Sequence, residues 1–181
     1  MSRKTVRDFF RRSEETMHPS PRELQQMLSE ARSQELGSPR QLQLLESLRT
    51  NCPAFVPALL ISSRAELWGE ERAGPPEAFF NEIERMLHDA VEASGREPSA
   101  LIGLARFMSV VRDSPQAAEA LYREASTRAL EVLEESWAGL IETLGEQEKL
   151  EEAARTAEMA RGVFPQSRQI SEACEFAQLD K

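Results

Sequence analysis

The stretch SWAGLIETLGEQEKLEEAARTAEMARGVFP, residues 136–165, contains two successive amphipathic patterns that decide the fold of the chain. In its first part, apolar residues recur at the i, i+3, i+4 and i+7 positions of a short helix: Trp137, Leu140, Ile141 and Leu144. Gly145 is expected to end that helix, because glycine adopts the left-handed conformation without steric cost. A second helix follows, whose inward face carries small residues: Ala153, Ala157 and Ala160. Pro165 ends it, so the stretch predicts two short antiparallel helices in close contact.

At these positions the sequence resembles the tetratricopeptide repeat (TPR), a helix–turn–helix unit of about 34 residues. Residues at the spacing of its eight signature positions are Trp137, Leu140, Ile141, Leu144, Ala153, Ala157, Ala160 and Pro165. Two of them depart from the usual residue types, since Ile141 replaces a small residue and Ala157 an aromatic one. The resemblance implies an all-α fold of stacked helix pairs and a protein that binds other proteins. It also implies that Trp137 is buried between the helices of its unit and the end of the preceding unit.

The same spacing recurs about one repeat period earlier, in Leu101, Leu104, Ala105 and Met108. A partner helix is expected from Pro115, with Ala118, Tyr122 and Ala125 on its inward face. An earlier unit consists of a helix at 54–68, with Phe55, Ala58, Leu59 and Ser62 inward, and a helix at about 77–93. The loop Gly69–Pro76 between them is the expected insertion in that unit.

Helix start signals flank these units on both sides. The segments Ser20-Pro21-Arg22-Glu23 and Ser38-Pro39-Arg40-Gln41 each combine an N-cap serine, a first-turn proline and an acidic or amide residue three positions on. A last helix begins near Ser167, with inward residues Ile170, Ala173, Cys174, Phe176 and Ala177. The sequence therefore predicts an all-α, right-handed superhelix of about three TPR-like helix pairs, with N-terminal helices and a C-terminal capping helix. It divides the chain into a basic extension (1–18) and one helical-repeat domain (19–181).

The composition indicates a globular protein with an acidic body. Of the 181 residues 40% are hydrophobic and 29% are charged, and the formal net charge is −9. Residues 1–12 carry a net charge of +4, so the rest of the chain carries −13. An acidic body disfavours nucleic acid as the main ligand, because phosphate binding requires a basic surface. No apolar run reaches the length of a membrane span, and the N-terminus lacks the apolar core of a secretory signal, so a cytoplasmic location is expected.

The residue types that perform catalysis are scarce and scattered. Cys52 and Cys174 lie far apart, without metal-ligand spacing, and free thiols are the expected state. His88 lies one helical turn from Glu84 and Glu92, but a solvated histidine among carboxylates is much more common than a metal face. No nucleophile motif or phosphate-binding glycine loop is present. We therefore expect no enzyme activity, no metal, no cofactor, no small-molecule substrate and no membrane partner.

The resemblance implies that ligands bind in a concave groove formed by the first helix of each pair. Groove positions flank the apolar stripes, and the predicted partner-binding residues are Leu60, Arg64, Ile102, Arg106, Glu135, Glu142 and Glu146. The expected ligand is a peptide or helix of another protein. These positions lack the lysine- and asparagine-rich clamp with which some relatives hold a C-terminal carboxylate, so a co-receptor for chaperone tails is disfavoured.

Several functional interpretations are compatible with these features. The first is a cytoplasmic adaptor or scaffold that holds a segment of a partner protein in its groove. The alternative is a small acidic TPR chaperone for substrates of secretion systems or assemblies, a class with similar size and an N-terminal helical extension. A weaker third interpretation is a regulatory subunit that docks through its basic extension. A homodimer formed through the N-terminal helices also stays open.

Overall fold

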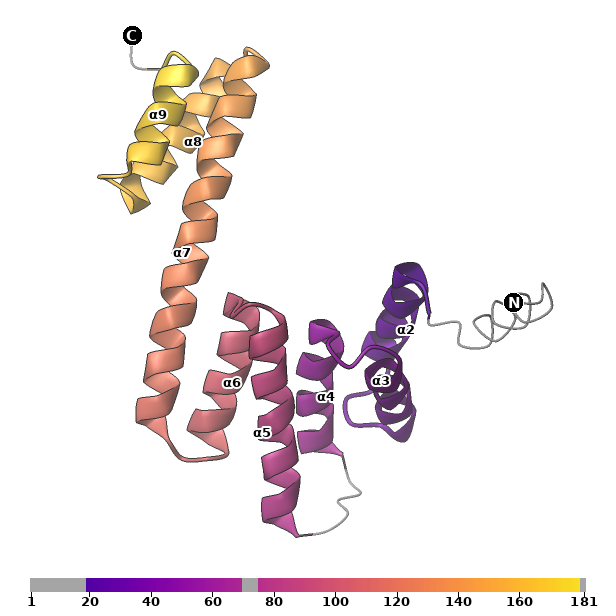
Figure 1. Cartoon of the computed structure of the whole chain (residues 1–181). Helices are drawn as coiled ribbons and strands as arrows, with labels where there is room; N and C mark the ends of the chain where they lie inside the picture. The colour runs from indigo at the N-terminus through magenta and orange to yellow at the C-terminus, as the bar shows by residue number, and fades with distance from the viewer. Residues whose placement is uncertain (1–18, 70–74, 180–181) are drawn as a thin grey trace, which may run out of the picture.

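The chain folds as a succession of α-helices joined by short turns (Figure 1). The computed structural model describes residues 19–69 and 75–179, and it contains no strand within those ranges. The helices are α2 (Pro21–Ser33), α3 (Pro39–Asn51), α4 (Val56–Trp68), α5 (Pro76–Ala93), α6 (Pro98–Val110), α7 (Pro115–Glu146), α8 (Leu150–Val163) and α9 (Arg168–Phe176). The prediction of an all-α fold is confirmed. The basic extension (1–18) and most of the predicted insertion loop lie outside the described residues.

Prolines and serine N-caps set where most of these helices begin. Helices α2 to α7 each carry proline in the first two positions, where the missing N–H has no helical partner to lose. The hydroxyl of Ser20 accepts a hydrogen bond from the N–H of Glu23 (3.3 Å). The Glu23 carboxylate in turn accepts from the N–H of Ser20 (2.7 Å), which completes the predicted capping box.

The turn between α2 and α3 is held by the buried side chain of Gln41. Ser38 caps α3 as predicted, but the Gln41 amide does not close a second capping box. Its oxygen accepts from the N–H of Gly37 (2.8 Å), and its nitrogen donates to the carbonyl of Ala31 at the end of α2 (2.9 Å). Gly37 has a left-handed φ of 77°, and a Cβ there would lie 2.8 Å from the backbone of residues 68 and 69. Glycine therefore allows this turn to lie against the end of α4.

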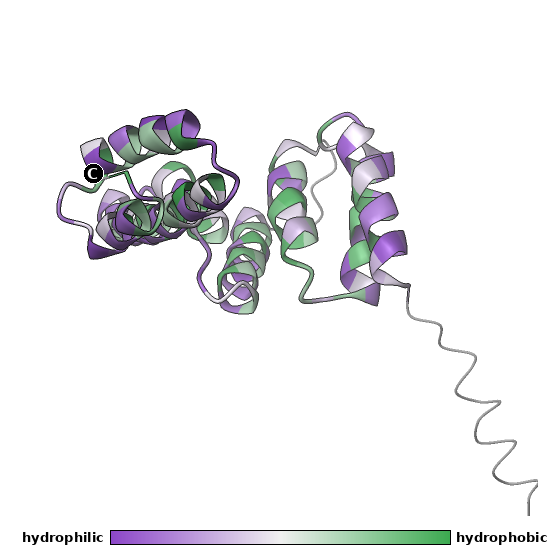
Figure 2. Ribbon diagram, turned by 90° about the horizontal axis from the view of Figure 1, so that it is seen from above, coloured by the Kyte–Doolittle hydropathy of each residue, from purple (hydrophilic) through white to green (hydrophobic). Residues whose placement is uncertain are grey.

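Three hydrophobic clusters hold the helices together, and two helices are shared between clusters. Helices α2, α3 and α4 enclose the first, around Leu28, Leu45 and Leu48. Helices α4 to α7 enclose the second, which contains the largest side chains. The C-terminal part of α7, with α8 and α9, encloses the third, which consists mostly of alanines. Figure 2 shows hydrophobic residues mainly on the helix sides that face neighbouring helices, as expected for stacked amphipathic helices.

Helix α7 is one continuous helix of 32 residues, and this corrects the prediction of a short helix around Trp137. Gly145 does not end it. The helix closes after Glu146, and Glu148 takes the left-handed conformation (φ 59°). The N–H of Lys149 then bonds the carbonyl of Leu144 (3.0 Å), which is the Schellman arrangement. The physical reason for the continuity is that residues 126–136 contain no glycine or proline and are mostly good helix formers.

Some side chains that were expected to face inward lie at the surface. Leu140 is 45% exposed, and Tyr122 and Phe176 are also exposed. Trp137 is only half-buried, packed edge-on against Phe164 with ring centroids 5.9 Å apart. The prediction that Trp137 is enclosed by the preceding unit is wrong, because α7 carries it away from that unit (Figure 1). The small residues of α8 are buried as predicted: Ala153, Ala157 and Ala160.

Two arginines at the ends of α6 form ion pairs with glutamates of the neighbouring helices α7 and α5. Arg96, in the turn before α6, binds both carboxylate oxygens of Glu124 on α7, at 2.6 and 2.5 Å. Hydrogen bonding from Arg96 lowers the pKa of Glu124 to about 2. Arg112, at the end of α6, pairs with Glu77 (2.8 Å) and Glu84 (2.6 Å) on α5. These pairs fix the two ends of α6 relative to its neighbours.

The Arg96–Glu124 pair predicts a defined acid sensitivity. The folded-state pKa of Glu124 lies below the ordinary value of about 4.5 for a glutamate, so its contribution to stability is present above about pH 4.5 and is lost as the pH falls towards about 2. We expect the free energy of unfolding of the native chain to exceed that of Glu124→Gln at neutral pH, and the difference to shrink towards zero near pH 2. Urea unfolding followed by circular dichroism across this range measures the difference. A difference that stays constant with pH would contradict the assignment.

Two glycines of α7 provide a second prediction, which concerns the packing of α9 on α7. A Cβ at Gly139 would meet nothing within 4 Å, whereas a Cβ at Gly145 would lie 2.7 Å from the Cβ of Ala177, the C-cap residue of α9. Gly139→Ala is therefore expected to raise the free energy of unfolding by up to about 1 kcal/mol through helix propensity alone. Gly145→Ala is expected to lower it by about 1–3 kcal/mol, because α7 and α9 must separate. Equal effects of the two substitutions in urea unfolding would show that α9 does not pack closely on α7.

Candidate functional site

An apolar groove of about 900 Å³ lies between α4 and α6. Its inner surface is formed by Leu60 of α4, the buried Leu87 of α5, and Gly103 and Phe107 of α6. A Cβ at Gly103 would lie 3.1 Å from Leu60 Cδ2 and 3.4 Å from Leu87 Cδ2. Glycine at position 103 therefore allows Leu60 and Leu87 to pack directly against the backbone of α6 at the floor of the groove.

Large apolar side chains at the edge of the groove are exposed to solvent. Trp68, the last residue of α4, is 72% exposed, and Val110, the last residue of α6, is 76% exposed. Leu36 and Ile102 also line the groove and are exposed to lesser degrees. Single exposed apolar residues are ordinary, but several that line one concavity mark an interaction site.

The charged residues of the groove are mostly basic. Arg32, Arg64 and Arg106 line it, together with the single carboxylate of Glu97. None of the three arginines forms an ion pair with a carboxylate in the part of the chain that the structure describes. On a chain of net charge −9, the groove is therefore a local basic and apolar surface.

The structure brings together four of the seven predicted site residues: Leu60, Arg64, Ile102 and Arg106 all line this groove. Sequence reasoning missed the contributions of Trp68, Val110 and Arg32. Trp68 and Val110 are the last residues of their helices, where helical periodicity no longer separates inward from outward positions. An exposed tryptophan beside a glycine- and proline-rich loop is a usable signal for such a site.

The other three predicted residues lie elsewhere. Glu135, Glu142 and Glu146 are exposed on the C-terminal half of α7, which packs against α8 and α9. At 1.5 Å per residue, Glu142 lies about 25 Å along the helix axis from Ala125, which still contacts the cluster of α4 to α6. The structure thus does not place the glutamates in the groove with the arginines.

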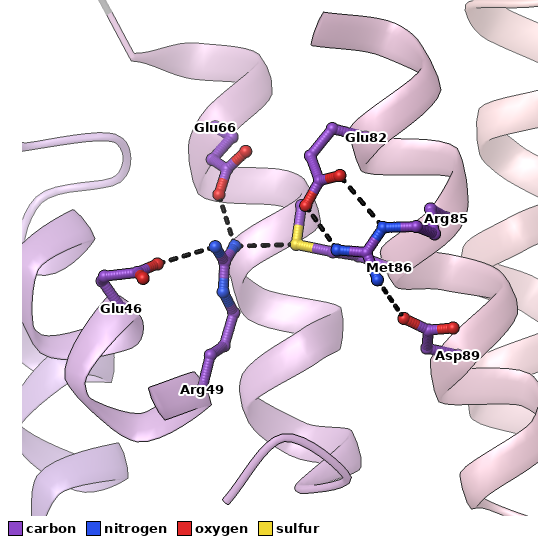
Figure 3. Close-up of polar contacts among 7 residues, drawn as sticks. All are labelled: Glu46, Arg49, Glu66, Glu82, Arg85, Met86 and Asp89. Atoms are coloured by element: carbon purple, nitrogen blue, oxygen red, sulfur yellow. Dashed lines mark hydrogen bonds and ion pairs between the residues drawn. The ribbon is translucent and has the colours of Figure 1, made fainter. Parts of the chain in front are cut away.

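A second, acidic hollow of about 340 Å³ lies where α3, α4 and α5 meet, and its charges are paired within the fold. Arg49 on α3 binds Glu46 and Glu66, each at 2.7 Å, and also contacts the sulfur of Met86 on α5 (Figure 3). Burial raises the pKa of Glu66, and the positive charge of Arg49 opposes that rise. Since both carboxylates are already paired with Arg49, which also contacts α5, the cluster serves to hold three helices together.

The described residues contain no group of three or more histidine, cysteine, aspartate or glutamate side chains arranged to hold a metal ion. Glu84, which the sequence places one turn from His88, is instead paired with Arg112. Cys52 and Cys174 form no disulfide with each other. Among the helices of residues 19–69 and 75–179, none is long and apolar enough to cross a membrane.

Comparisons with known proteins identify the relatives of this chain. Residues 16–95, which include helices α2 to α5, match the model of the Myxococcota tetratricopeptide repeat protein family. The chain is also 41% identical over 160 residues to an uncharacterized 18.1 kDa protein in the carS 3′ region of Myxococcus xanthus. That similarity covers 88% of this chain and 94% of the relative. No solved structure matches.

The helical architecture and the family model both indicate a tetratricopeptide repeat protein. Tetratricopeptide repeats serve as modules for interaction between proteins, and proteins built from them are generally non-catalytic. The expectation of a protein partner thus rests on the family as well as on the exposed groove. The chain belongs to the Myxococcota tetratricopeptide repeat protein family.

Proposed function

We propose that this protein is an adaptor that holds a short amphipathic segment of a partner protein in the groove between α4 and α6. The observation that carries the proposal is the concentration of exposed apolar side chains around a concavity with three unpaired arginines in the described residues. The segment performs no chemistry in the groove and undergoes none. We place its action in a reducing compartment such as the cytoplasm, because Cys52 and Cys174 form no disulfide with each other.

The apolar anchor of the ligand is expected to contact Leu60 and Ile102. These side chains lie on α4 and α6 and both line the groove. Because apolar anchors that fill central pockets dominate the energetics of interfaces, most of the affinity should come from this contact. A leucine, methionine or aromatic side chain of the partner has a suitable size for the groove.

Acidic residues beside the anchor are expected to contact Arg64 and Arg106. Arginines without intramolecular partners attract carboxylates, and a pair of them fixes the orientation of the bound segment. The acidic body around the groove repels the same ligand elsewhere, so binding is confined to this surface. The expected ligand therefore combines one or two large apolar residues with neighbouring glutamates or aspartates.

This proposal can be tested with a library of random peptides displayed on phage. We expect peptides selected on the native chain to contain apolar residues flanked by acidic ones. For a selected peptide, Arg64→Glu/Arg106→Glu is expected to raise the dissociation constant by at least tenfold, which corresponds to about 1.4 kcal/mol. The loss should be smaller at high salt, where exposed charges are screened. Titration calorimetry measures each constant.

A matched control is Arg155→Glu/Arg168→Glu, which makes the same charge change on α8 and α9. Both arginines are exposed and lie outside the groove. The control should bind the peptide as the native chain does, and thermal melting should show that both variants are folded. If the peptides lack acidic residues, or if both variants lose affinity equally, the groove is not the binding site.

A further inference from the structure

The two halves of α7 bury opposite sides of the helix. The N-terminal half buries Ala118 and Ala125, and Ala125 belongs to the cluster formed with α4 to α6. The C-terminal half buries Ala138 and Ile141 against α8 and α9. At about 100° per residue, Ala125 and Ile141 differ by roughly 160° and Ala118 and Ala138 by roughly 200°. The helix therefore carries α8 and α9 away from the unit in front of them, as Figure 1 shows.

The middle of α7 consequently has no buried side chain. Residues 126–136 are all exposed or half-buried, over about 15 Å of helix. An apolar stripe nevertheless runs along one side of it, and its members recur one or two helical turns apart. We call this the α7 stripe, and its members are Tyr122, Ala129, Leu130, Leu133, Trp137 and Leu140. Tyr122, Leu130 and Leu140 are 38%, 45% and 45% exposed, so the stripe is largely uncovered.

A shallow hollow continues the α7 stripe at its N-terminal end. It has a volume of about 700 Å³ and lies between α6 and α7, with Ser109 on one wall and Ala118, Tyr122 and Ser126 on the other. In a stack of helix pairs, such a hollow is filled by the first helix of the next pair. Here that helix is the C-terminal half of α7, which cannot turn back onto its own N-terminal half. Each chain thus carries both surfaces of one helix–helix contact and cannot bring them together.

The distribution of charge along α7 indicates how two copies would fit. From Ala129 to Glu146 the helix contains five glutamates and no lysine or arginine. From Pro115 to Arg128 it contains two glutamates and two arginines, Arg123 and Arg128. Side-by-side helices in parallel orientation would place the two acidic halves together, which is unfavourable. An antiparallel pair places each acidic half against the neutral half that carries the arginines.

We propose that a second copy of the chain covers the α7 stripe, with the two α7 helices antiparallel about a twofold axis near residues 129–133. The Leu140 end of each stripe then lies against the Tyr122 end of the other, next to the hollow between α6 and α7. Such an interface is isologous, so one surface serves both protomers and the assembly closes as a dimer. It differs from a dimer through the N-terminal helices, which would leave the α7 stripe uncovered.

The mass of the full chain in solution tests the proposal. Sedimentation equilibrium at concentrations from micromolar to near millimolar should give about 41 kDa, twice the 20.4 kDa of the chain. Leu130→Glu/Leu140→Glu should reduce the mass to that of the monomer without loss of helicity, because both side chains are already exposed. Met159→Glu/Val163→Glu makes the same change at exposed positions of α8 outside the stripe and should stay dimeric. A native chain that is monomeric throughout, or a dimer insensitive to the stripe variant, overturns the proposal.

Crosslinking tests the orientation of the helices. In a Cys52→Ser background, Ser126→Cys and Ser136→Cys place single exposed thiols on the two sides of the proposed axis. A short bismaleimide linker should join a mixture of the two variants into heterodimers in preference to homodimers. In the antiparallel pair, position 126 lies beside position 136 of the other copy, whereas like positions are separated by about 15 Å along the axis. Preferential homodimers would show a parallel pair and would overturn the proposed arrangement.

Discussion

The arrangement of this protein depends on the continuity of helix α7. A helix without an internal break fixes the direction of every side chain along it, because each residue turns the next by about 100°. The buried face of α7 changes sides along its length, so α8 and α9 cannot lie over α6 as the next pair of a regular stack would. The groove proposed as the ligand site is accordingly lined by residues that precede α7 in the chain. A short segment is responsible for the continuity of α7: residues 126–136 contain no residue that would stop the helix.

Local features of the fold were predictable from sequence because they depend on interactions between near neighbours. The serine caps at Ser20 and Ser38, the proline starts and the inward alanines of α8 all lie where the pattern placed them. The continuity of α7 was not predicted, because the spacing of apolar residues is the same in a separate short helix and in the end of a long one. Gly145 illustrates the ambiguity. Glycine at position 145 allows Ala177 to lie against α7. The left-handed conformation after the end of the helix is taken by Glu148 and not by Gly145.

The candidate site was likewise predictable from the sequence only in part. Leu60, Arg64, Ile102 and Arg106 came together because α4 and α6 are the first helices of consecutive pairs, an order that the succession of helical patterns predicts despite the insertion between α4 and α5. The prediction that Glu135, Glu142 and Glu146 line the same groove assumed a third helix pair stacked on the second in the regular way. The continuous helix α7 prevents that stacking. The family model also matches residues 16–95, outside the stretch with the most repeat-like spacing. The part of the chain with the clearest repeat pattern is therefore the part that departs most from a regular stack.

The composition of the third cluster has a consequence for how the molecule unfolds. Its buried residues are mostly alanines, with Ile141, Ile170 and Cys174, whereas the second cluster contains leucine, isoleucine, methionine, valine and phenylalanine. Less apolar area per residue means less stabilisation per residue. Residues 126–136 in the middle of α7 have no buried side chain, so the second and third clusters share no side chains. The unfolding of one cluster is therefore coupled to that of the other only through the helix backbone. We therefore expect the C-terminal helices to form a separate foldon, whose amide protons exchange through a partial opening while the groove-bearing helices remain closed.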